Sequence, residues 1–151
     1  MQKFICFLGR LCFSIIFIVA GIQKFFNWDA SEQQLVNQML DVLSKSYHQG
    51  WAQGLFDKIL PLAPTLLVVG TIIEVVGGLL VLLGIQVRFG AFILCLFLIP
   101  TTLLFHNFWV LQGSEQQLQM AMFLKNLSIF GGGLVLLAFG KGPKKIKVEG
   151  K

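Results

Sequence analysis

The residues of this chain that could do chemistry are polar side chains placed within apolar sequence. Glu74 lies near the middle of an apolar run, 62–85, that contains no other charge. A carboxylate is costly in hydrocarbon, so we expect it to face the interior of a helix bundle and to pair with a cation or a hydrogen-bond donor. The other candidates for such a polar core or ligand site, each in or beside an apolar run, are Arg10, Lys24, His106, Lys125 and Asn126.

Two roles for this polar core stay open. Ionisable groups inside a membrane often mark ligand or proton sites, and His106 and Lys125 are suited to hydrogen-bond a quinone carbonyl while Glu74 relays its proton. Polar contacts between membrane helices also fix packing, in which case the charges only lock the bundle. At a rise of ~1.5 Å per residue, Glu74 lies at mid-span and within upward reach of the long Arg10 side chain. No catalytic residue can be identified.

Cysteine and histidine chemistry is poorly supported. Cys6, Cys12 and Cys95 form no C-x-x-C pair, and the first two point away from each other on a helix. We expect all three to be structural. His106 directly follows the third apolar run and has no nearby carboxylate, so it is weak evidence for a metal site. Haem ligation by two histidines would need His106 to meet His48 of the loop. The chain itself therefore predicts no metal and no resident cofactor, and any electron carrier must come from elsewhere.

Four apolar runs must position these residues, at about 4–22, 62–85, 89–105 and 120–139. Each is close to the length that crosses a hydrocarbon core of ~30 Å as a helix. With 56% apolar and 13% charged residues, the composition is typical of membrane proteins. A soluble four-helix bundle would need a polar stripe along every helix, and these runs have almost none. We predict an all-α integral membrane protein, in which residues 1–151 form a single domain with four transmembrane helices.

Small and polar residues at helical spacing predict which face of each helix packs inward. In the first two helices these residues are Arg10, Ser14, Phe17, Gly21 and Lys24, then Gly70, Glu74, Gly77, Gly78 and Gly84. In the last two they are Cys95, Thr102, His106 and Trp109, then Lys125, Ser128 and Gly132, flanked by Asn126 and Gly133. Pro100 should kink the third helix, with Thr101 and Thr102 satisfying the freed backbone groups.

The loop between the first two spans is expected to contain two short amphipathic helices. The first has Asp29 as its expected N-cap, carries Leu35, Met39, Val42 and Leu43 on one face, and ends near Gly50. The second carries Trp51, Leu55 and Ile59 on one face and is stopped by Pro61 and Pro64. These helices either cap the bundle, which we favour, or lie on the outer membrane surface.

Positive charges give the orientation. The side that holds both termini collects Lys3, Arg88, Lys141, Lys144, Lys145, Lys147 and Lys151. The other side has only Lys24, Lys45 and Lys58, spread over a long loop. Because positive residues favour the cytoplasm, both termini are predicted there and the long loop outside. The basic tail then serves as a topology determinant, and we expect contact with membrane lipid and none with nucleic acid.

The ordered motifs of the chain resemble the DoxX family. They are Arg10-Leu11, Gly21 with Lys24-Phe25, Glu74-Val75-Val76-Gly77-Gly78, Gly84 with Arg88, His106-Asn107-Phe108-Trp109, and Lys125-Asn126-Leu127-Ser128 with Gly131-Gly132-Gly133. The resemblance implies a four-helix protein of the bacterial inner membrane, related to the small DoxD-type subunit of thiosulfate:quinone oxidoreductase. Some relatives are linked to membrane oxidoreductase complexes and redox stress.

Two functions follow from the residues and the resemblance together. The first is an accessory subunit of a quinone-linked or sulfur and redox-stress oxidoreductase, with a polar pocket around Glu74, a quinone as ligand, and membrane or soluble redox proteins as partners. Any enzyme activity would then belong to a complex, not to this chain alone. The alternative is a non-enzymatic membrane protein that binds lipid, a small solute or a protein partner. A homo-oligomer is compatible with both.

Overall fold

The computed structural model describes residues 1–45, 54 and 57–142, and this part of the chain is helical without strands. Its helices are α1 (Gln2–Phe26), α2 (Trp28–Lys45), α4 (Ala63–Leu83), α5 (Val87–Phe105) and α6 (Gly113–Phe139), with short 3-10 turns η1 (Leu60–Leu62) and η2 (Phe108–Val110). The stretches long and apolar enough to cross a membrane are four: Gln2–Phe26, Asp57–Leu83, Val87–Val110 and Gly113–Phe139. The predicted fold class is confirmed. The last helix is longer than its predicted apolar run, because it starts at Gly113 and not near Met120.

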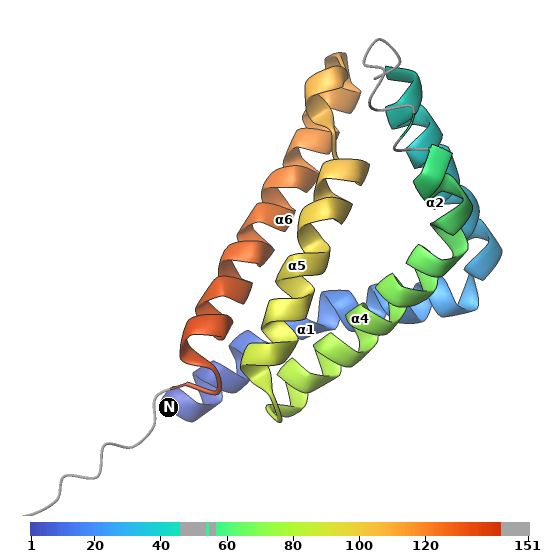
Figure 1. Cartoon of the computed structure of the whole chain (residues 1–151). Coiled ribbons are helices and arrows are strands. Elements are labelled where there is room, and N and C mark those ends of the chain that lie inside the picture. Colours follow the sequence, from blue (N-terminus) through green and yellow to red (C-terminus); the bar gives the residue numbers. More distant parts are fainter. Residues whose placement is uncertain (46–53, 55–56, 143–151) are drawn as a thin grey trace, which may run out of the picture.

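The two ends of the bundle differ (Figure 1). The start of α1, the turn between α4 and α5, and the end of α6 lie together at one end, which we call the termini end. There Gly142 lies against the Cys6 side chain and Gly140 against that of Arg88. Helix α2 and turn η2 lie at the opposite end, called here the loop end. This arrangement is expected of a chain that crosses a membrane four times in alternating directions.

Helices α1 and α4 pack closely because small residues line their contact. A Cβ atom added to Gly21 would lie 2.6 Å from Cγ2 of Val75, and one added to Gly78 would lie 2.6 Å from Cγ1 of Ile18. Such distances leave no room for a side chain, so these glycines permit the close approach. Ser14, Phe17 and Gly21 are buried on α1, as are Gly70, Glu74, Gly77 and Gly78 on α4. The predicted inward faces of these two helices are confirmed in their central parts.

Helix α5 packs between α4 and α6 (Figure 1). Its side toward α4 contributes Ala91 and Leu94, both fully buried, to a core shared with Val81. Pro100 lies within the helix, and the Thr101 hydroxyl donates to the carbonyl oxygens of Phe97 and Leu98 at 2.9 and 3.1 Å. The Thr101 hydroxyl thus bonds carbonyl groups beside the one that Pro100 leaves free at Leu96, and Thr102 instead accepts from Asn126 of α6.

The predicted inward face of α6 is wrong by about one residue. Lys125, Ser128 and Gly132 are exposed, whereas Gly133 is the buried residue of this helix and lies against Cys95. Asn126 donates from Nδ2 to Oγ1 of Thr102 at 3.1 Å. A shift of one residue rotates a helical face by about 100°. The three consecutive glycines at 131–133 therefore lie on different sides of the helix, and the sequence does not indicate which of them packs inward. Helix α6 therefore contacts α5 through Asn126 and Gly133, which the sequence analysis placed beside the predicted inward face.

Helix α2 caps the loop end of α4, as favoured above. Leu35 and Met39 are buried against Ala63 and Leu67, and Gln38 Nε2 donates to the Leu104 carbonyl oxygen of α5 at 2.8 Å. The expected N-cap is wrong, because α2 already starts at Trp28 and so places Asp29 in its first turn.

The second expected loop helix falls mostly outside the described residues, since Trp51 and Leu55 are not among them. The two prolines do not stop a helix. Pro61 lies in η1 and Pro64 in the first turn of α4, where a proline loses no helical hydrogen bond, so both lead into the membrane helix. The basic tail from Lys144 onward also lies outside the described residues.

Candidate functional site

The central feature of the membrane region is an ion pair between Lys24 and Glu74. The Lys24 Nζ atom lies 2.5 and 2.6 Å from the two carboxylate oxygens of Glu74. Glu74, at the middle of α4, is 4% exposed, whereas the Lys24 side chain is 30% exposed. The Glu74 side chain is therefore enclosed, while the Lys24 side chain is partly exposed.

Local packing positions this pair. Gly21, one turn before Lys24, leaves room for the Glu74 Cβ, which would be 3.4 Å from a Cβ at position 21. The Phe97 ring of α5 lies over the pair, with its centroid 5.8 Å from the Lys24 Nζ, and Gly70 accepts the edge of the same ring. A lysine ammonium has three N–H donors. Two suffice for the carboxylate, so the geometry leaves one donor beside an aromatic face.

Arg10 is not the partner of Glu74. Its guanidinium group lies against Gly84 at the C-terminal end of α4, where φ is +70°. The carbonyl end of a helix attracts cations, and glycine is the residue that fits both this backbone angle and the close approach of the side chain. The Nε atom of Arg10 is buried and has no hydrogen-bond partner among the described residues.

The remaining site candidates lie elsewhere. His106 Nδ1 is 2.8 Å from Gln119 Oε1, which links the end of α5 to α6. Lys125 is exposed, and its Nζ lies 3.3 Å from the Met122 sulfur on its own helix. Of the six polar residues singled out from the sequence, the structure joins Lys24 to Glu74, and it gives the other four separate partners or surroundings.

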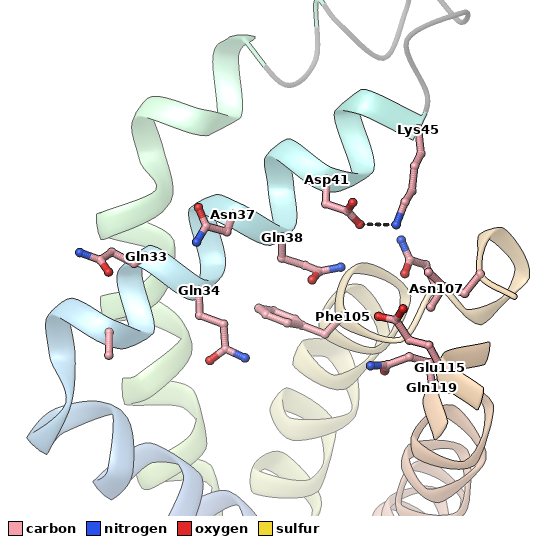
Figure 2. A pocket seen from close by; sticks show the side chains of 12 residues that line it. Gln33, Gln34, Asn37, Gln38, Asp41, Lys45, Phe105, Asn107, Glu115 and Gln119 are labelled. Atoms are coloured by element: carbon pink, nitrogen blue, oxygen red, sulfur yellow. Dashed lines mark hydrogen bonds and ion pairs between the residues drawn. The ribbon is translucent and has the colours of Figure 1, made fainter. Parts of the chain in front are cut away.

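A polar groove lies at the loop end, between α2 and the start of α6 (Figure 2). Its volume is about 650 Å³. One wall is the polar face of α2, with Gln34, Gln38, Asp41 and Lys45, and the other includes Asn107 and Gln119. Asp41 and Lys45 form an ion pair at 2.6 Å within the α2 wall. Gln119, which holds His106, thus also belongs to the groove.

Sequence reasoning missed this groove. The available signal was the spacing of polar residues on α2, where Gln33, Asn37 and Asp41 recur every four positions and Gln34 and Gln38 follow the same period. That pattern is equally typical of a helix face in water, and only the packing of the opposite face on α4 turns it toward α6.

The part of the chain that the structure covers contains no candidate metal site and no disulfide bond. No group of three or more histidine, cysteine or acidic side chains is placed to hold a metal ion there. The three cysteines are unpaired, with Cys95 buried, Cys6 partly buried and Cys12 exposed.

Comparison with known proteins agrees with this architecture. The chain is 23% identical over 135 residues to the inner membrane protein YphA of Escherichia coli (strain K12), a match that covers 89% of this chain and 82% of the relative. No solved structure matches the chain. The model of the DoxX family matches residues 5–107, which include most of α1, all of α4 and α5, and the Lys24–Glu74 pair. The chain belongs to the DoxX family.

Proposed function

We propose that this DoxX protein is an accessory subunit of a quinone-linked oxidoreductase in the bacterial inner membrane. The observation that supports this most is the Lys24 side chain, which Glu74 holds by its ammonium group and which stays 30% exposed beside the Phe97 ring. A quinone head group combines a flat ring with carbonyl acceptors. The proposed site offers an aromatic face for the ring and one N–H donor for a carbonyl oxygen.

Glu74 has a positioning role in this proposal. Its buried carboxylate fixes the direction of the Lys24 side chain, because both oxygens accept from the same ammonium group. Electrostatic interactions are stronger in a medium of low polarity than in water, so a single N–H donor here binds a carbonyl oxygen more tightly than at an exposed site. Electrons come from a partner redox protein, since the sequence carries no motif for a redox centre.

The proposed orientation places both termini in the cytoplasm. It rests on the excess of lysine and arginine at the termini end and on the positive-inside rule. Helix α2 and the polar groove would then face the outside. Lys24, two residues before the end of α1, would lie in the outer half of the membrane.

A second candidate function is that of a non-enzymatic membrane protein in which the pair only locks α1 on α4. The observation that favours it is the completeness of the pair. Both oxygens of Glu74 already have a donor, and 4% exposure leaves the residue little access to a ligand. The two candidates differ in whether the free donor of Lys24 binds anything.

Binding of a short-chain ubiquinone analogue to the full chain in lipid nanodiscs tests the proposal. The informative variant is Lys24→Met with Glu74→Leu, which removes both charges together and leaves no unpaired carboxylate. Lys125→Met is the matched control, because it removes an exposed lysine from a different helix. We expect saturable binding by the parent and the control, and loss of saturation in the double variant. Equal binding by all three proteins would refute the quinone site.

A further inference from the structure

The polar groove at the loop end is a second site, separate from the Lys24–Glu74 pair. It is bounded by α2 on one side and, on the other, by the end of α5, the residues that flank η2 and the first turns of α6 (Figure 2). None of its lining residues belongs to the pair or to the packing around it. Its volume of about 650 Å³ falls within the range of ~300–1,000 Å³ that is usual for small-molecule sites.

The lining of the groove is rich in side-chain amides. Gln33, Gln34, Asn37 and Gln38 come from α2, and Asn107 and Gln119 come from the opposite wall. An amide offers both donors and acceptors, as does a hydroxyl group. A ligand with several hydroxyl groups could therefore match this wall, whereas a purely apolar ligand would leave the amides without partners.

Asn107 presents its side-chain amide to the groove from the wall opposite α2. The residue as a whole is 6% exposed and lines the groove. Packing therefore fixes the residue, while its amide group stays available to a ligand. In Figure 2 this amide points toward α2, into the space between the two walls.

Two neighbouring contacts hold the walls in place before any ligand binds. Gln38 Nε2 donates to the Leu104 carbonyl oxygen at 2.8 Å and so ties α2 to α5. Gln119 accepts from His106 at 2.8 Å, which leaves its own Nε2 group as a donor for the groove. Fixed donors lower the cost of ordering the site on binding.

The charges of the groove disfavour an anionic ligand. Asp41 and Lys45 neutralise each other at 2.6 Å, and Glu115 adds a further carboxylate in the first turn of α6. A phosphate or carboxylate group would meet this negative charge. Phe105 adds an aromatic surface against which the C–H face of a sugar ring can pack.

We propose that this groove binds a neutral, polyhydroxylated solute of monosaccharide to disaccharide size. The amides of α2 and of Asn107 and Gln119 hydrogen-bond its hydroxyl groups, and Phe105 contacts one face of its ring. This site is independent of quinone binding.

The test is calorimetric titration of the full chain in nanodiscs of phosphatidylethanolamine and phosphatidylglycerol. Maltose and glucose serve as neutral probes and glucose 6-phosphate as the anionic one. Maltoside and glucoside detergents are to be avoided, because their head groups resemble the probes. We expect saturable binding of at least one neutral sugar and a weaker response to glucose 6-phosphate than to glucose.

Variants locate the binding. Asn107→Leu should weaken the affinity about tenfold, as expected for one lost buried hydrogen bond. Gln117→Leu is the matched control, since this exposed amide of α6 does not line the groove. If Asn107→Leu does not fold, Gln34→Leu replaces it, because Gln34 is exposed on α2 and lines the groove. The proposal is overturned if neither neutral sugar binds, if the anionic sugar binds equally well, or if the groove variants bind like Gln117→Leu.

Discussion

Lys24 and Glu74 are separated by fifty positions in the sequence, yet the Nζ atom of one lies 2.5 and 2.6 Å from the carboxylate oxygens of the other. The contact joins the end of α1 to the middle of α4. The two helices are therefore displaced along their axes, since the last turn of α1 contacts the middle of α4. The relative displacement of the two helices decides which cation reaches the buried carboxylate.

Breaking the pair on one side should destabilise the protein. Glu74→Leu leaves the Lys24 ammonium without its partner, at an expected cost of ~1–3 kcal/mol, reduced from the value for a fully buried pair because Lys24 is partly exposed. Adding Lys24→Met should recover part of this loss. The measurement is thermal unfolding in nanodiscs. Asp41→Leu, which breaks the more exposed pair with Lys45, is the control and should change stability by ~1 kcal/mol or less.

A glycine pair on α6 tests which face of that helix packs inward. Gly133→Ala places a methyl group against the Cys95 sulfur and 3.2 Å from the Phe13 ring, so we expect a loss of ~1–3 kcal/mol from overpacking. Gly131→Ala meets no atom within 4 Å. It should be neutral or stabilising by ~0.5–1 kcal/mol, since alanine favours the helix. Equal melting temperatures for the two variants would contradict the packing described here.

Adjacent polar residues on α6 provide a second test of the same face. Asn126→Leu removes the bond to Thr102 and should cost ~0.5–1.5 kcal/mol. Lys125→Leu changes an exposed residue and should alter stability by ~0.5 kcal/mol or less. Thermal unfolding of the two variants should therefore rank them in this order. The opposite order would support the face that was expected from the sequence.

The orientation can be measured with reporter fusions. A reporter attached after Gly142 should be active on the cytoplasmic side, and one attached after Lys45 should be active outside, because the lysine and arginine excess lies at the termini end. Reporters on the same side would contradict the four crossings. Reporters on opposite sides but inverted would retain the fold and reject the orientation.

The spans and the inward faces of α1 and α4 could be predicted from the sequence, because length, hydropathy and the spacing of small residues are local properties. Gly21, Gly77 and Gly78 mark these faces without knowledge of the neighbouring helix. The face of α6 could not be predicted, because consecutive glycines at 131–133 point in different directions and each is small enough for a helix contact.

The partner of Glu74 could not be predicted from the sequence for a different reason. Counting residues along each span assumes upright, level helices, and on that assumption Arg10 was within reach. In the structure Arg10 lies against Gly84, and Gly21 lies against Val75 and Glu74. The number of residues from the end of a span therefore does not give the level at which two helices meet. The groove depends in the same way on the packing of α2 on α4, which no local pattern specifies.

The most direct test of the proposed function is mass spectrometry of quinones that co-purify with the full chain from its own membranes. A quinone site at Lys24 predicts more quinone per protein than with an unrelated membrane protein of similar size prepared in parallel. It also predicts that the variant with Lys24→Met and Glu74→Leu falls to the level of that reference while Lys125→Met keeps the parent level. Quinone at the reference level in the parent itself would contradict the quinone site and leave the pair as a lock between α1 and α4.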